Sequence, residues 1–155
     1  TTLAEMVNAL YNFANAGILT HAYLMYGFPG AAAADTVDAL EIVRQLFQHG
    51  LLTSAYWHRF SLTVHSDVYR KHKHFNIVPV MQGDFTCNDL DHEGSDTLAW
   101  MGDGLSAAVY NYMHRAAIAR PVSAWFPKRV APPRVGRTFI AGLIAAHTGK
   151  RKKNV

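Results

Sequence analysis

Cysteine is almost absent from this chain of 155 residues, which contains Cys87 alone. A single cysteine cannot form an internal disulfide, and by itself it cannot hold a zinc ion or an iron–sulfur cluster. One free thiol is typical of a protein in a reducing compartment, so the sequence predicts a cytoplasmic location. No nucleophile motif surrounds Cys87, and we expect it to be a small buried hydrophobe.

Long apolar runs are also missing, although half of the residues are hydrophobic and only 17% are charged. No run reaches the ~18–20 residues of a membrane-spanning helix, so the sequence predicts a globular domain with a sizeable core. No signal peptide is visible. Because the chain starts with Thr1 and not with methionine, we expect it to be part of a longer protein.

Acidic residues are missing from the last third of the chain. All 11 Asp and Glu lie in residues 1–103, whereas ten of the 15 Lys and Arg lie in residues 104–155. This segment could bind RNA or another phosphate-rich partner, or it could be a solvated basic face that docks on an acidic part of the same protein. The second interpretation is favoured, because exposed aromatic residues are not interleaved with the basic ones.

The apolar pattern of the first 66 residues predicts a βαβ unit. Thr2 and Glu5 match a capping box, which starts a helix that Gly17 can end. A nearly continuous apolar run over 18–26 predicts a strand buried on both faces, as in a parallel sheet. A helix capped near Asp35 or Thr36 and a second strand over about 54–64 complete the unit.

The remaining residues carry a weaker pattern. We expect a C-terminal extension over 67–149, with a short extended piece at 76–80, a helix over 104–118, a proline-rich linker and a short last helix near 138–146. Residues 150–155 are expected to form a basic disordered tail.

The loop after the first expected strand reads Tyr26-Gly27-Phe28-Pro29-Gly30. In parallel α/β sheets, ligands bind at the carboxyl ends of the strands. Gly27 and Gly30 would let a ligand approach the backbone closely, and Pro29 would stiffen the loop. The alternative is an ordinary turn that needs these residues for geometry alone, and the spacing by itself favours that alternative.

Polar and apolar residues alternate along the second expected strand. Alternation predicts one face with Arg59, Ser61, Thr63 and His65, opposite a face with Tyr56, His58, Phe60, Leu62 and Val64. Polar groups within a buried strand need partners. A polar ligand in a barrel lumen would supply them, and so would water at an exposed sheet edge.

Nine histidines raise the possibility of a metal site. No zinc-binding spacing is present, so solvated loop residues are the favoured interpretation, with a metal hydrolase as an alternative. The candidate ligands for that alternative are His65, His72, His74, Asp89, Asp91, His92 and Glu93.

Several segments together resemble the C-terminal half of radical S-adenosylmethionine (radical SAM) enzymes of the cobalamin-binding type. The resemblance covers roughly residues 1–126. It rests on HAYLMYGFPG at 21–30 followed by Asp35-Thr36, and on VRQLF at 43–47, WHRF at 57–60, TVHS at 63–66, NDLDHE at 88–93 and YNYMH at 110–114.

This resemblance implies the C-terminal part of a partial (β/α) TIM-type barrel with parallel strands, in which residues 1–66 form the last βα units. It also implies an enzyme that reductively cleaves S-adenosylmethionine at a four-iron four-sulfur cluster to start radical chemistry. The cofactor-binding residues it implies are Tyr23, Met25, Gly27, Pro29 and Gly30, together with His58 and Arg59 on the following strand, where Arg59 would pair with a carboxylate or another anion.

The chain departs from that family in two places. Alanines occupy 31–34, where related chains carry a Glu-Thr pair, so any contact from that glutamate is lost. The cysteine loop C-x-x-x-C-x-x-C is absent, so we expect this chain to be inactive alone and to need the missing N-terminal part of the same enzyme. Cobalamin would bind through a missing N-terminal domain. The alternative function is a non-catalytic module that holds RNA or a phosphate-rich partner with the basic last third.

Overall fold

The computed structural model describes residues 1–80, 88–93 and 97–153. Its main body is a two-stranded parallel sheet, with strands β1 and β2 joined by helix α2. The elements are α1 (Leu3–Asn15), β1 (His21–Tyr26), α2 (Ala33–Gln48), β2 (Ser54–Arg59), β3 (Leu62–Thr63), α3 (Asp67–Arg70), η1 (His72–Phe75), β4 (Val78–Val80), β5 (Asp89–Glu93), η2 (Ala99–Met101), α4 (Gly102–Met113), η3 (Val122–Trp125) and α5 (Phe139–Lys153).

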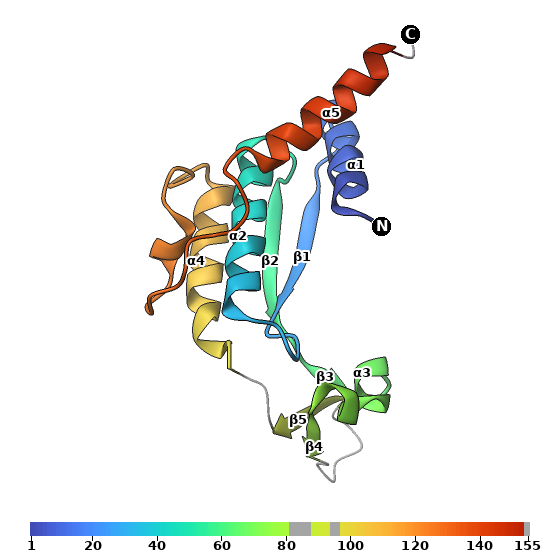
Figure 1. Ribbon diagram of the computed structural model, residues 1–155, viewed down its shortest axis with the longest axis vertical. Helices are drawn as coiled ribbons and strands as arrows, with labels where there is room; N and C mark the ends of the chain where they lie inside the picture. Colours follow the sequence, from blue (N-terminus) through green and yellow to red (C-terminus); the bar gives the residue numbers. More distant parts are fainter. Residues whose placement is uncertain (81–87, 94–96, 154–155) are drawn as a thin grey trace.

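Helices α2 and α4 lie on the same side of the β1–β2 sheet (Figure 1). Helices α1 and α5 pack together at the upper end of this view, and the three short strands lie at its lower end. In the register of the sheet, His21 lies opposite Ser54 and Tyr26 lies opposite Arg59. The predicted parallel βαβ unit is therefore confirmed, and within the described residues its sheet is open.

The start of α1 follows the expected capping box. The Thr2 hydroxyl accepts a hydrogen bond from the Glu5 N–H at 3.2 Å, and the Thr2 N–H donates to the Glu5 carboxylate at 2.7 Å. These bonds satisfy backbone groups that would have no partner in the first turn. Gly17 has a φ of 74°, a left-handed conformation that ends the segment, as predicted.

Helix α2 supplies much of the core. It begins at Ala33, and Asp35 caps it from within the first turn, because the Asp35 carboxylate accepts from the Ala32 N–H at 2.9 Å. The apolar stripe of α2 is buried between the sheet, α4 and α5. It comprises Val37, Leu40, Val43, Leu46 and Phe47.

The second strand is shorter than expected. β2 ends at Arg59, and Leu62–Thr63 belongs to a separate antiparallel sheet with the order β3-β5-β4. The apolar residues expected to continue the strand instead form a small second core with Ile77 and Leu90. Phe28 joins the two parts, because its ring packs edge-on against Phe60 at 5.3 Å and against Phe75 at 5.7 Å between centroids.

The C-terminal extension also differs from expectation at its helix ends. α4 ends at Met113 and not near residue 118, and left-handed residues Arg115 and Ala117 follow it. α5 runs to Lys153, so it is longer than the helix expected near 138–146 and includes the first residues of the expected tail. Among the described residues, no helix combines the length and apolar character needed to cross a membrane.

Candidate ligand-binding face of the parallel sheet

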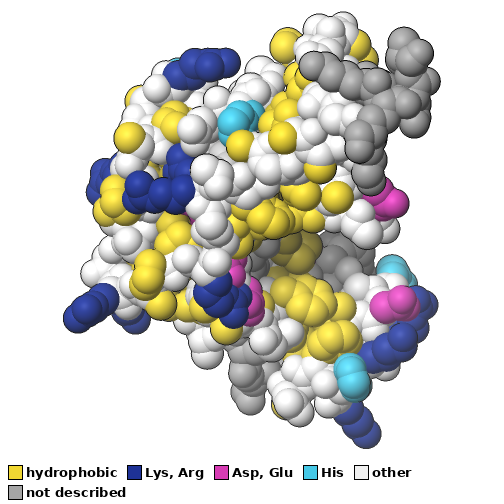
Figure 2. All heavy atoms as spheres, turned by 45° about the horizontal axis from the view of Figure 1, so that its top comes forward, with side chains coloured by type: hydrophobic (Ala, Val, Ile, Leu, Met, Phe, Trp, Pro, Cys, Tyr) yellow, Lys and Arg dark blue, Asp and Glu magenta, His cyan; other side chains and the backbone are white. Residues whose placement is uncertain are grey.

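One face of the β1–β2 sheet is uncovered. Tyr23, Met25 and Tyr56 point to this face and are 77%, 59% and 56% exposed, whereas Trp57 on the opposite face is only 6% exposed. β1 was expected to be buried on both faces, and this is wrong for the described chain because helices cover only one face. Exposed apolar groups gathered in one place are typical of binding or interaction surfaces. Figure 2 shows hydrophobic side chains around a hollow in the middle of the molecule.

Four rings form a continuous row on this open face. The centroid of Tyr23 lies 4.7 Å from that of His21 and 5.3 Å from that of His58, and the Tyr23 and His58 rings are stacked. The His58 ring contacts Tyr56 at 4.5 Å. At one end of the row, His21 Nδ1 and the Ser54 hydroxyl share a hydrogen bond of 2.7 Å. Such a row offers flat aromatic faces and edges to a planar ligand.

The glycine-containing loop lies directly at the carboxyl end of β1. Gly27 and Gly30 have φ angles of 73° and 84°, which side chains rarely tolerate. The Ala31 N–H donates to the Phe28 carbonyl at 2.9 Å and closes a turn with Pro29 and Gly30 at its centre. This is the arrangement of a type II turn, in which proline and glycine occupy these positions. The loop therefore forms a hydrogen-bonded turn at the carboxyl end of β1.

The expected site residues fall into two groups. Tyr23, Met25 and His58 lie together on the open face, and Gly27, Pro29 and Gly30 form the adjoining loop. Arg59 follows His58 on β2, so strand alternation places its side chain on the other side of the sheet. Its Cγ would lie 3.8 Å from a Cβ atom added at Gly27. The cofactor contacts assigned to these seven residues stay predictions.

Two further residues belong to the open face. His21 and Tyr56 complete the ring row, although neither was among the site residues expected from the sequence. Residues two positions apart on a strand point to the same face, so His21 could have been inferred from Tyr23 and Tyr56 from His58. The signal was therefore present in the sequence.

The histidine-rich segment gathers no metal-binding group within the described residues. No three His, Cys, Asp or Glu side chains among them lie close enough to hold a metal ion. His72 instead bonds the Tyr69 carbonyl at 2.9 Å, and the His92 ring packs on Phe60. Cys87 lies outside the described residues, as do the side chains of Asp91 and Glu93.

Part of the basic last third docks on acidic residues of α2. Arg134 donates to Asp35 and Asp38 at 2.6 Å each. The pKa of the Asp35 carboxyl is held below its usual value, first by the bond from the Ala32 N–H and then by Arg134. These contacts fix the segment that precedes α5 against the N-terminal half of α2.

Comparison with known proteins found no matching family model, no matching curated protein and no matching solved structure.

Proposed function

We propose that this chain is part of a radical SAM enzyme, in which the open face of the β1–β2 sheet lines the chamber that holds S-adenosylmethionine. The observation that carries the proposal is an uncovered aromatic face of a parallel sheet, adjoining a glycine-containing turn at the strand end. In a parallel barrel, helices cover the outer face of the strands, and ligands bind at the carboxyl ends. The unequal faces of this sheet agree with such an arrangement.

The residues on the open face suit the chemistry of this ligand. The rings of Tyr23 and His58 can stack with a planar base. Met25 adds a flexible apolar surface between that row and the loop. At Gly27 the absence of a side chain lets a ligand approach the backbone. In this proposal the chain orients the cofactor and excludes water from it.

The iron–sulfur cluster does not fit the residues of this chain. A four-iron cluster needs several thiolates, and the sequence has Cys87 alone. The cluster would therefore be held by another segment of the enzyme, where it would supply the electron for cleavage of the cofactor. No chemical step is assigned to residues of this chain.

The test is a titration of S-adenosylmethionine into the 155-residue chain, followed by nuclear magnetic resonance. We expect saturable shifts at the Met25 methyl and the Gly27 amide. Tyr23→Ala should weaken binding about tenfold, because a stacking contact contributes about 1–3 kcal/mol. Phe139→Ala is the control, because Phe139 is also an exposed aromatic residue, 40% accessible, but lies at the start of α5 and not on the sheet or its loop.

Two results would overturn the proposal. One is a titration without shifts at the open face. The other is an equal loss of affinity in the Tyr23→Ala and Phe139→Ala variants, since that would mean nonspecific contact with exposed aromatic rings.

A further inference from the structure

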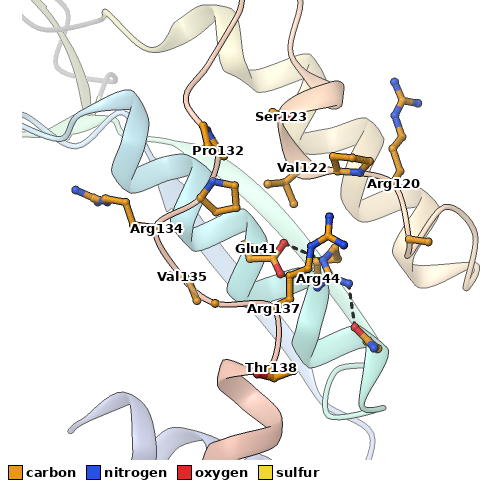
Figure 3. Close-up of a pocket in the computed structure, with 15 residues that line it drawn as sticks. Glu41, Arg44, Arg120, Val122, Ser123, Pro132, Arg134, Val135, Arg137 and Thr138 are labelled. Atoms are coloured by element: carbon orange, nitrogen blue, oxygen red, sulfur yellow. Dashed lines mark hydrogen bonds and ion pairs between the residues drawn. The ribbon is translucent and has the colours of Figure 1, made fainter.

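A second hollow lies on the surface of α2, separate from the open face. Its volume is about 640 Å³, within the range of small-molecule sites. Three segments enclose it: one face of α2, residues 119–123 and residues 132–138 (Figure 3). No residue of β1, β2 or the glycine-containing loop lines it. We name it the strap pocket, after the segment 132–138 that crosses α2.

The floor of the strap pocket is a neutralised ion pair. Arg44 donates two hydrogen bonds to the Glu41 carboxylate, at 2.9 and 2.6 Å, and both side chains are buried. Arg44 also bonds the Gln48 side chain at 2.9 Å and the Ile118 carbonyl at 3.1 Å. The Glu41 carboxylate also accepts a hydrogen bond of 2.8 Å from the Gln45 side-chain amide. These partners leave Glu41 with little capacity to neutralise any other cation.

Part of the positive charge on the rim of the strap pocket is not paired with a carboxylate of the residues that the structure describes. Arg134 is satisfied by Asp35 and Asp38. Arg120, in contrast, has only neutral partners among the described residues: it donates to the Ala124 carbonyl at 2.6 Å, and its guanidinium lies 4.2 Å from the centre of the Trp125 ring.

Arg137 is the rim residue with the most unused capacity. Within the described part of the chain, it forms no hydrogen bond or ion pair. Figure 3 shows its side chain reaching from the strap into the pocket on the side of Arg44. A guanidinium has five N–H donors in a planar fork, which matches the oxygens of a phosphate or carboxylate. The side chain is thus free to accept an anion in the pocket.

We infer that the strap pocket binds the phosphate group of a small molecule, with Arg137 as the principal contact. Arg120 contributes the second unbalanced charge from the rim, and the hydroxyls of Ser123 and Thr138 line the same hollow. An anion placed here would form charge-assisted hydrogen bonds with these side chains. The inference does not depend on the proposed function, because the two surfaces share no residue.

Inorganic pyrophosphate is the first probe, titrated into the 155-residue chain by calorimetry. Arg137→Ala should weaken binding about tenfold, and Arg120→Ala should weaken it less. Arg129→Ala is the matched control, because Arg129 is exposed in the same basic segment but does not line the pocket. Resonance shifts in the unmodified chain should gather at Gly136 and Ser123, which tests the location without any substitution.

A short single-stranded RNA is the second probe and separates the two sources of phosphate. If the pocket takes small molecules, RNA should bind more weakly than pyrophosphate per phosphate group, and pyrophosphate should displace it. Equal losses in Arg137→Ala and Arg129→Ala would overturn the inference, because they would show a diffuse basic surface. Absence of saturable pyrophosphate binding would overturn it as well. Tyr23→Ala should leave pyrophosphate affinity unchanged, so this test and the S-adenosylmethionine test fail independently.

Discussion

The two faces of the β1–β2 sheet carry similar apolar residues in very different surroundings. Ala55 and Trp57 lie on the covered face, under the helices, while Tyr23, Met25 and Tyr56 on the other face are mostly exposed. Continuous apolar character along a strand is typical of sheets covered on both sides. The difference therefore indicates that the open face is adapted to contact something other than water. Substitutions on the two sides should therefore differ in their effect on stability.

The largest loss of stability is expected from breaking the buried ion pair of Glu41 and Arg44, which lies in the helical layer that covers the sheet. Glu41→Ala leaves Arg44 buried without its counter-ion, which should cost about 3–5 kcal/mol of unfolding free energy. The exposed pair of Asp67 and Arg70 has the same spacing of three residues and serves as the control. Asp67→Ala should cost less than about 1 kcal/mol in urea denaturation. Equal costs would contradict the assignment of the covered layer as the core.

A core truncation compares the two sides directly. Leu40 is fully buried on α2, so Leu40→Ala should cost about 2–5 kcal/mol. Met25→Ala on the open face should cost less than about 0.5 kcal/mol, since surface substitutions have small effects. Thermal unfolding of the isolated chain measures both. A large cost for Met25→Ala would mean that the open face is already covered, for example by a second copy of the chain.

Tyr112, which is buried in the covered region, should make the unfolding free energy depend on pH at alkaline pH. Burial raises the pKa of its hydroxyl to about 12, although the bond from Trp125 Nε1 opposes this shift. Above pH 10 the unfolded chain loses this proton while the folded chain keeps it, so stability falls as the pH rises toward 12. The loss should amount to about 2–3 kcal/mol. Tyr112→Phe should flatten this part of the stability curve, and an unchanged curve would contradict the assignment.

The smallest effect concerns the loop beside the open face. Gly27→Ala forces a side chain into a left-handed conformation and should cost about 1–2 kcal/mol. Gly142 provides the control, because it lies inside α5 and an added Cβ there would meet no neighbouring atom within 4 Å. Gly142→Ala should stabilise the chain by about 0.5–1 kcal/mol. Chemical denaturation should show changes of opposite sign in the unfolding free energy of the two variants. That result would confirm that the left-handed backbone conformation, and not a lack of space for a side chain, requires glycine at position 27.

Features set by local chemistry could be predicted from the sequence. The capping box at Thr2 and Glu5, the apolar stripe of α2 and the turn at Pro29 and Gly30 depend on residues close together in the chain. The parallel pairing of the strands also followed from their order around one helix. These parts of the fold and the loop of the candidate site agree with the structure.

Features set by distant contacts could not be predicted. The apolar alternation runs on to Val64, and no local signal shows that Phe60 and Leu62 leave the sheet for a second core. The exposure of one face of β1 depends on where helices far along the chain pack. The strap pocket likewise depends on contacts such as Arg44 with the Ile118 carbonyl, 74 residues away.

The most direct test of the central claim is the coding sequence upstream of Thr1, translated in the same frame. If the open face lines the chamber of a radical SAM barrel, that sequence should encode a C-x-x-x-C-x-x-C loop and further alternating strands and helices. A reading frame that begins at or near Thr1, or an upstream segment without this cysteine loop, would contradict the claim. The open face would then require a different ligand or partner.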